Sequence, residues 1–266
     1  IDVDCLNIDS ASFQQLKEEA RHDPGKVEEQ ILSIVSRRGK MHNPVTGSGG
    51  MLIGTVQESG PRFPSRNVKK GMKIATLVSL TLTPLRIEKI KKIHMDTGQV
   101  EIKGQAVLFA SGPFALLPDD IPEKVALAVL DVCGAPAQTA RLVRPQDRVV
   151  VLGAGGKSGL LSLYQAWKKA GKSGQVIAIE ASEKACRDIR SLGLAHEVIR
   201  LNATDPMAVY EAVHTVTCGK MADLTINCVN ACDTELSSIL ATRDQGLVYF
   251  FSMAVQFTKA ALGAEG

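Results

Sequence analysis

The sequence has no cysteine pair at the C-x-x-C spacing, although it contains six cysteines: Cys5, Cys133, Cys186, Cys218, Cys228 and Cys232. Small disulfide-stapled domains and structural zinc lobes need closely spaced cysteines, so neither class is expected here. Free cysteines are typical of a reducing compartment, and we therefore expect a cytoplasmic protein.

Long apolar runs and a strong net charge are also missing. No stretch approaches the ~20 apolar residues that span a bilayer, and no charged start followed by an apolar core marks a secretion signal. With 31 basic and 28 acidic residues the net charge is +3, which argues against nucleic acid or a membrane as a partner. The hydrophobic content of 45% over 266 residues predicts a globular enzyme of one or two domains.

Both ends of the sequence suggest that residues are missing. The first residue is Ile1 rather than Met, and residues 3–8 alternate in hydrophobicity like a strand that is already under way. At the other end the sequence stops at Gly266, before a sixth strand of the domain described below. We therefore expect the natural N-terminus, and also the C-terminus, to lie beyond this sequence.

A glycine-rich turn is the most informative feature that is present. The apolar run 149–152 is predicted to be a strand, residues 153–159 a turn, and residues 160–167 an amphipathic helix. Such a turn lets the backbone approach a pyrophosphate, and the helix start attracts its negative charge. Ser158 takes the third position of G-x-G-x-x-G counted from Gly153 and Gly155, so a glycine turn of some other α/β domain stays open. We predict a dinucleotide site formed by Gly153, Gly155, Gly156, Lys157, Ser158 and Gly159.

The next predicted strand, at 175–179, ends in Glu180, about 20 residues beyond the turn. A carboxylate at this place hydrogen-bonds the ribose diol, so we expect NAD rather than NADP as the cofactor. A solvated acid at a helix entry is the alternative. Asn230 and Ser252 follow later strands, and we assign them to the nicotinamide side because ligands bind at the carboxyl ends of parallel strands.

The pattern along the chain divides it into two predicted domains. From residue 149 onward strands alternate with helices, at about 149–152, 175–179, 197–201, 223–229 and 247–252, which predicts a doubly wound parallel sheet of the Rossmann type. Residues 51–117 contain short β-rich runs at 51–56, 73–78, 81–85, 101–102 and 106–110, which predict a small distorted barrel. Helices are expected at 12–20 and 24–38. The predicted class is α/β, with domains at 1–117 and 118–266.

A barrel-like half joined to a nucleotide domain resembles the medium-chain dehydrogenase/reductase superfamily, in which the barrel is GroES-like. Residues 153–159 look like the glycine turn of the zinc-free, quinone-reductase-like branch. Residues 49–56 resemble the segment G-H-E-x-x-G-x-V of the family, with Gly50 in place of the zinc-binding histidine and Met51 in place of glutamate. The resemblance therefore implies that the metal site is lost. Cys5, His42 and Cys133 keep a catalytic zinc open as an alternative.

The amino-acid sequence of residues 41–51 and 73–85 is similar to that of NAD-dependent dehydrogenases that act on a small β-amino acid in lysine fermentation. The resemblance implies oxidative deamination to a β-keto acid and ammonia by a cytoplasmic enzyme, which we expect to be a homodimer. Asp9 is a candidate for binding the substrate ammonium or accepting its proton, with helix capping as the alternative. His42 and Asn43 precede a glycine-rich loop and are the other catalytic candidates, because an imidazole is the natural choice of base in proteins.

Two further functions stay open at this stage. One is an NADPH-dependent quinone or enoyl reductase of the same superfamily, for which Lys184 and Arg187 are the basic residues near Glu180. The other is a protein that binds a dinucleotide but has lost catalysis. One fold hosts many reactions, so the fold does not choose among them.

Overall fold

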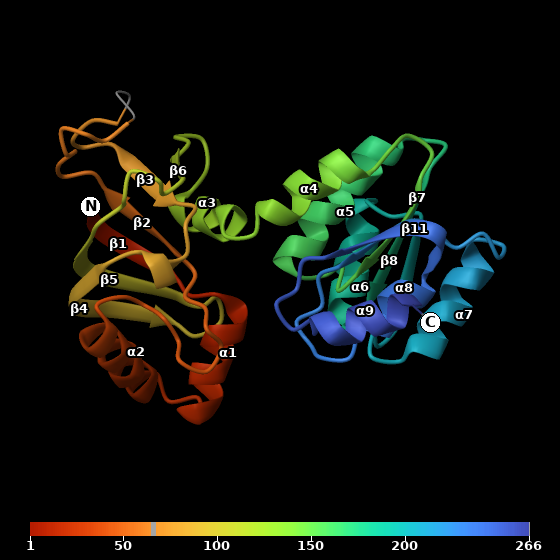
Figure 1. Ribbon diagram of the computed structural model, residues 1–266, viewed down its shortest axis with the longest axis horizontal. Coiled ribbons are helices and arrows are strands. Elements are labelled where there is room, and N and C mark those ends of the chain that lie inside the picture. Colours follow the sequence, from red (N-terminus) through yellow and green to blue (C-terminus); the bar gives the residue numbers. More distant parts are fainter. Residues whose placement is uncertain (65–67, 266) are drawn as a thin grey trace. The chain divides into compact units, whose positions relative to one another are not determined.

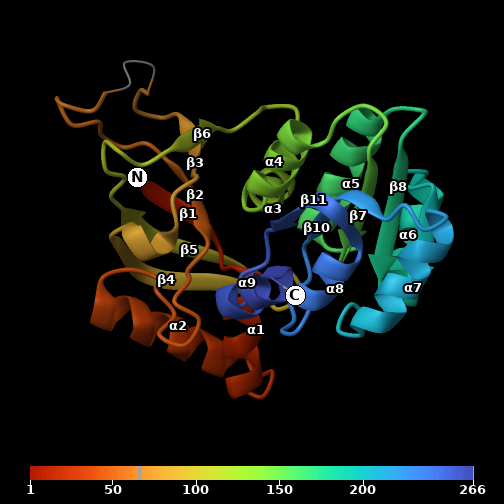
Figure 2. The ribbon, with the colours of Figure 1, turned by 45° about the vertical axis from the view of Figure 1, so that its right-hand side comes forward.

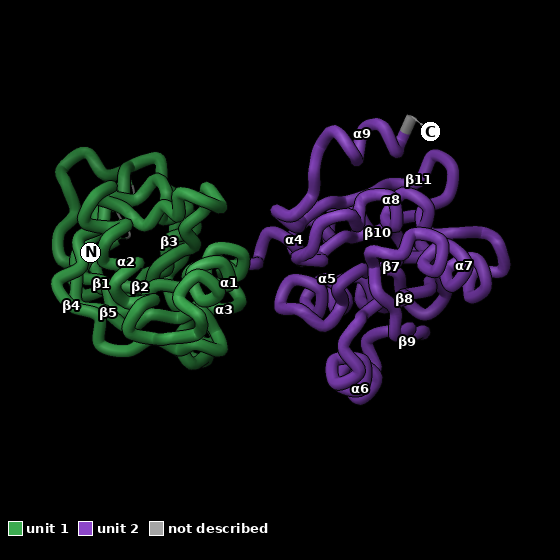
Figure 3. Tube along the Cα trace, turned by 90° about the horizontal axis from the view of Figure 1, so that it is seen from below, with its two compact units in different colours: residues 1–131 green, residues 132–266 purple. Residues whose placement is uncertain are grey.

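The computed structural model describes residues 1–64 and 68–265, which form two compact units at 1–131 and 132–266 (Figure 3). The division falls later than the predicted boundary at 117/118. Residues 118–131, which lie between the predicted and the observed boundary, contain α3 (Glu123–Leu130). Leu127 of this helix is buried against Met51, Ile53 and Ala75 of the first unit. Lys124 of α3 also pairs with Glu101 at 2.8 Å, and together with His94 it lowers the pKa of that carboxyl to about 2.

The first unit is built on a six-stranded sheet in which every pair of neighbours is antiparallel. Its strands are β1 (Asp2–Asn7), β2 (Met51–Thr55), β3 (Lys73–Thr76), β4 (Leu85–His94), β5 (Gln99–Ala106) and β6 (Phe114–Leu116), in the order β4-β5-β1-β2-β3-β6. The helices α1 (Ser10–Glu19) and α2 (Pro24–Arg38) lie beside this sheet (Figure 1). Helical residues such as Phe13 and Ile31 share one buried cluster with Leu6 and Ile102 of the sheet.

Helices α1 and α2 each begin directly after an aspartate that caps the first turn. The side chains of Asp9 and Asp23 accept hydrogen bonds from the third backbone N–H that follows, at 2.9 Å and 3.0 Å. Pro24 occupies the first turn of α2, where a missing N–H costs nothing. The predicted helix at 24–38 is confirmed in both bounds.

Two short predicted strands of the first unit are wrong. Residues 80–82 form the 3₁₀ turn η1 (Leu80–Leu82), because the Ser79 hydroxyl accepts from the Thr81 amide and turns the chain. Pro84 cannot donate to a ladder, so β4 begins only at Leu85. Likewise β5 ends at Ala106, where the prediction placed the start of a strand at 106–110.

The second unit has a five-stranded parallel sheet in the order β11-β10-β7-β8-β9. Its strands are β7 (Arg148–Leu152), β8 (Gln175–Glu180), β9 (Glu197–Arg200), β10 (Ala222–Asn227) and β11 (Thr242–Phe250). Its helices are α4 (Gly134–Leu142), α5 (Lys157–Ala170), α6 (Glu183–Leu192), α7 (Pro206–Val216), α8 (Glu235–Leu240) and α9 (Phe257–Glu265). The strand order reverses on the two sides of β7, which is the topological switch point of a dinucleotide-binding sheet.

Both faces of the central strands β10, β7 and β8 are buried, as their continuous apolar runs require. Val149 and Val151 of β7 point into a cluster with α5 and α6, and Val150 and Leu152 point into a second cluster with α7. Helix α9 lies against α8 beside β11 (Figure 2). The predicted α/β class is therefore confirmed, and the five predicted strands are present.

Among the described residues, no helix combines the length and the apolar character that a membrane crossing requires.

A charged cluster joins three neighbouring strands of the parallel sheet. Asp223 of β10 accepts from the Arg148 guanidinium at 2.9 Å, from the Arg148 backbone N–H at 2.8 Å and from Arg243 at 2.6 Å. Burial alone would raise the pKa of Asp223, but these hydrogen bonds and the nearby positive charge outweigh it and hold the pKa well below its usual value.

We expect Asp223→Asn to lower the free energy of unfolding by about 2 kcal/mol at pH 7. A carboxyl with a lowered folded-state pKa stabilises above its unfolded pKa of about 3.9 and loses that contribution as the pH falls. The difference between the wild type and the variant should therefore be smaller at pH 3 than at pH 7 in denaturant titrations. An equal difference at both pH values would refute this account.

Candidate functional site

The glycine turn lies between β7 and α5 in the second unit. Gly153 has a φ of 70°, a left-handed value that glycine adopts without strain, and its N–H donates to the Ile179 carbonyl at 3.0 Å. Gly156 is the N-cap of α5, and no side chain of the described residues caps this helix. A helix start without a side-chain cap attracts an anion such as a pyrophosphate.

Gly159 brings α5 close to the turn. A Cβ atom at this position would lie 2.1 Å from the Gly153 carbonyl oxygen and 2.8 Å from the Ala154 Cα. Only glycine fits there, so Gly159 provides the close helix–strand packing that the plain motif assigns to its third glycine. This explains why Ser158 is tolerated at the third position.

Glu180 lies beside the turn, at the carboxyl end of β8. One of its carboxylate oxygens accepts from the Gly155 N–H at 2.9 Å, and the other accepts from the Ser182 N–H at 2.8 Å. A Cβ atom at position 155 would lie 2.9 Å from that carboxylate and 2.5 Å from the Ala185 Cβ. The second glycine of the motif therefore makes room for the acid, and the structure brings the two predicted parts of the ribose and phosphate site together.

Asn230 and Ser252 follow the carboxyl ends of β10 and β11, on the same edge of the sheet. Asn227, a polar residue at the end of the apolar strand β10 that was not assigned to the cofactor, organises this edge. Its buried amide donates to Thr234 at 2.8 Å and accepts from the Val229 N–H at 2.9 Å. Asn227 is thus a positioning residue, and its signal was a polar side chain at the end of an apolar strand.

In the first unit, Gly50 packs directly on the end of β1. Its φ is 92°, and a Cβ atom there would lie 1.9 Å from the Asn7 carbonyl oxygen and 2.8 Å from the Asp9 nitrogen. A metal-binding histidine therefore does not fit at this position. Burial also raises the pKa of the Cys5 thiol to about 11. Without a histidine at position 50, these residues do not fit the zinc site of the metal-dependent branch.

Asp9 combines two roles at the end of β1. One carboxylate oxygen caps α1, as the alternative interpretation of this residue expects. The other oxygen, Oδ2, is buried and has no hydrogen-bond partner among the described residues. Buried carboxylate oxygens are rarely left unpaired, so this atom is suited to receive a ligand's ammonium group.

Asn7 stands two residues before Asp9 and is completely buried, at 0% exposed. Neither its amide nitrogen nor its amide oxygen has a hydrogen-bond partner among the described residues. In an extended chain, side chains two residues apart point to the same side, and the intervening Ile8 belongs to the opposite, apolar cluster. Asn7 and Asp9 therefore place one hydrogen-bond donor and two hydrogen-bond acceptors in the same region. The sequence identified Asp9 as a candidate but not Asn7.

The loop after α2 is tied to α1. Asn43 is completely buried, donates to the Gln15 side chain at 2.8 Å and accepts from the Val45 N–H at 2.8 Å. Ser12 and Thr46 share a hydrogen bond of 2.5 Å. The amide of Asn43 is thus engaged in holding the loop, and the geometry gives this residue a positioning role. His42 lies next to it at the start of the loop and is partly exposed.

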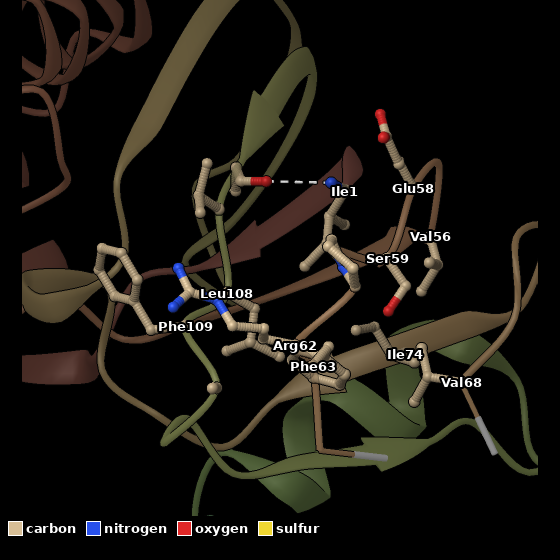
Figure 4. A pocket seen from close by; sticks show the side chains of 15 residues that line it. Ile1, Val56, Glu58, Ser59, Arg62, Phe63, Val68, Ile74, Leu108 and Phe109 are labelled. Atoms are coloured by element: carbon tan, nitrogen blue, oxygen red, sulfur yellow. Dashed lines mark hydrogen bonds between the residues drawn. The ribbon is translucent and has the colours of Figure 1, made fainter. Parts of the chain in front are cut away.

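A separate hollow of about 600 Å³ in the first unit contains none of the predicted site residues (Figure 4). Phe63, Ile74 and Leu108 give it a mainly apolar lining, with Glu58 and Arg62 among its polar members. It therefore does not correspond to the Asp9 region.

The fold places the protein in a known structural class. A solved quinone oxidoreductase from Pseudomonas syringae pv. Tomato DC3000 superposes with a TM-score of 0.57 at 19% identity, covering 82% of this chain and 62% of that one. The JamJ enoyl reductase superposes with a TM-score of 0.64 at 11% identity, covering 99% of this chain and 69% of that one. With its parallel nucleotide sheet and antiparallel GroES-like unit, the protein has the fold of a medium-chain dehydrogenase/reductase.

The particular family follows from sequence comparison. Residues 1–118 match the model of the L-erythro-3,5-diaminohexanoate dehydrogenase N-terminal domain. The L-erythro-3,5-diaminohexanoate dehydrogenase of Acetoanaerobium sticklandii is 54% identical over 267 aligned positions, which cover 100% of this chain and 78% of the relative. The chain belongs to the L-erythro-3,5-diaminohexanoate dehydrogenase family. It is an oxidoreductase with a nicotinamide cofactor.

Proposed function

We propose that this protein oxidatively deaminates L-erythro-3,5-diaminohexanoate to 5-amino-3-oxohexanoate and ammonia, with NAD as the hydride acceptor. The buried oxygen of Asp9, which has no hydrogen-bond partner in the part of the chain that the structure describes, is the observation that carries the substrate half of the proposal. The carboxylate of Glu180 beside the glycine turn supports NAD as the cofactor. The cytoplasmic location and the homodimer stay predictions.

The reaction needs few protein groups besides the cofactor, which accepts a hydride when bound. Asp9 pairs with the 3-ammonium group and fixes its orientation, and a base removes one ammonium proton so that the nitrogen lone pair becomes available. His42 is our candidate for this base. The third carbon, which carries this nitrogen, then loses a hydride, and an iminium ion remains. Water adds to the iminium carbon, and cleavage of its C–N bond releases ammonia and the ketone.

The residues around Asp9 restrict what the site accepts. Asn7 offers both a donor and an acceptor next to the carboxylate, which suits an ammonium group or the water that attacks the iminium carbon. Gly50 lies against the backbone of residues 7–9 without a side chain. A small polar substrate with a positive charge therefore fits this region better than an uncharged quinone does.

Steady-state assays of the full chain test the proposal directly. With L-erythro-3,5-diaminohexanoate and NAD we expect NADH and ammonia in equal amounts, and slower turnover with NADP. L-Lysine serves as the control substrate, because it lacks an amino group at the third carbon. NADPH oxidation with a quinone or an enoyl thioester, without deamination, would establish the reductase alternative instead. NAD binding without turnover of any of these substrates would indicate a protein that has lost catalysis.

A further inference from the structure

Arg200 lies beside the acid that is assigned to the cofactor ribose. It ends β9, and in the register of the parallel sheet it is the neighbour of Glu180. The Leu201 N–H donates to the Glu180 carbonyl at 3.0 Å, which holds the two strand ends together. A cation at this place is what a 2′-phosphate of NADP would need, because guanidinium groups bind phosphate oxygens in pairs.

A second carboxylate holds Arg200. Glu183, in the first turn of α6, contacts the Arg200 guanidinium at 2.5 Å, and Arg200 also donates to the Ala181 carbonyl at 3.4 Å. The two basic residues of α6 are paired as well, since Lys184 contacts Asp188 at 3.0 Å and Arg187 contacts Glu183 at 3.3 Å. Glu183 therefore neutralises two cations close to Glu180.

We infer that two carboxylates, Glu180 and Glu183, set the cofactor preference of this enzyme, and that Arg200 is a latent ligand for a 2′-phosphate. Glu180 hydrogen-bonds the ribose diol and repels a phosphate at the 2′ position. Glu183 keeps the Arg200 guanidinium engaged, so that losing Glu180 alone does not create a full phosphate site. This inference rests on the proposed use of NAD and adds Glu183 and Arg200 as specificity-determining residues.

Calorimetric binding of NAD and NADP to the full chain tests the inference without any turnover. Glu180→Gln should shift the ratio of the two dissociation constants toward NADP by about 10-fold, because a charge repulsion is removed. Glu183→Gln alone should shift it by no more than about 3-fold, because Glu180 is still present and repels the 2′-phosphate. In the double variant Glu180→Gln/Glu183→Gln, the ratio of the dissociation constants should shift toward NADP by about 10-fold more than in Glu180→Gln. The reason is that Arg200 becomes free to make a charge-assisted hydrogen bond to the 2′-phosphate.

Arg200→Gln in the double variant should remove most of that additional gain. Glu197→Gln is the matched charge control, because Glu197 is exposed at the opposite end of β9. The ratio of the NAD and NADP dissociation constants should be the same in this variant as in the wild type. All four substituted side chains are at least partly exposed, so thermal unfolding should show that the variants stay folded.

The possible failures are distinguishable. If the wild type binds NAD but the double variant gains nothing beyond Glu180→Gln, the role of Glu183 is refuted while the proposed function stands. If Arg200→Gln weakens NAD and NADP equally, Arg200 contacts a part that both cofactors share and the inference is also refuted. If the wild type binds neither dinucleotide, the proposed function fails first.

Discussion

Replacing Asp9 by asparagine is expected to lower kcat/KM for L-erythro-3,5-diaminohexanoate by about 10²- to 10³-fold, an effect of the size that acid–base and charged contacts produce. The substitution removes the negative charge from Oδ2, which is buried and unpaired, and leaves an oxygen that can still cap α1. Asparagine and aspartate are equally good N-cap residues, so the fold should not change. NADH formation over a range of substrate concentrations measures the effect.

Asp23→Asn is the matched control for this experiment. Asp23 caps α2 with the same geometry, but its side chain is exposed. We expect Asp23→Asn to keep full activity, and both variants to unfold at the temperature of the wild type. NAD binding should also be unchanged in both, because the glycine turn belongs to the other unit. If Asp9→Asn keeps its activity within about 3-fold, Asp9 is only a helix cap and the substrate half of the site lies elsewhere.

The second large effect is expected at Gly159. Gly159→Ala should destabilise the nucleotide unit by about 3 kcal/mol or more, because the new methyl group would lie 2.1 Å from a backbone oxygen that cannot move away freely. The clash is with the turn itself, so NAD affinity should fall together with stability. Denaturant unfolding and calorimetric titration with NAD provide the two measurements.

Gly156→Ala separates binding from stability in the same turn. Its φ of −74° suits alanine, and the nearest atom to an added Cβ is 3.7 Å away. We expect this variant to stay within about 1 kcal/mol of the wild type, because the reduced freedom of the unfolded chain offsets part of the cost of the poorer N-cap that alanine makes. A methyl group at the N-cap would still obstruct a pyrophosphate, so NAD binding should weaken. Equal stability of Gly159→Ala and Gly156→Ala would contradict the packing role assigned to Gly159.

Local patterns predicted the nucleotide unit well because its signals are short-range. A buried parallel strand is a continuous apolar run, and β7 and β8 stand out for that reason. The helix at 24–38 carries its own start and stop, with Asp23 as a cap and a left-handed glycine at position 39. Antiparallel strands of the other unit were harder, because the isoleucines of β4 recur every third residue, at 87, 90 and 93, rather than every second residue, and Pro84 interrupts the preceding segment.

The candidate site also contains some residues that were predictable from the sequence and others that were not. Glu180 and the glycine turn are linked by a motif, so their proximity was predictable from spacing. Asn7 and Arg200 carry no motif, so only the tertiary structure shows their surroundings. Arg200 lies next to Glu180 only through the pairing of β8 with β9. Asn7 is notable only because it is buried and its amide has no hydrogen-bond partner among the described residues.

The sequence by itself determined the two-part architecture, the dinucleotide turn and the loss of the histidine at position 50, because each depends on residue types at fixed short spacings. Only the tertiary structure decided that Gly159 provides the close packing, that Asn43 positions a loop, and that one buried oxygen of Asp9 has no hydrogen-bond partner among the described residues. Such distinctions depend on which atoms of distant segments come within hydrogen-bonding or van der Waals distance. Burial then determines whether a polar atom without a partner has water or needs a ligand.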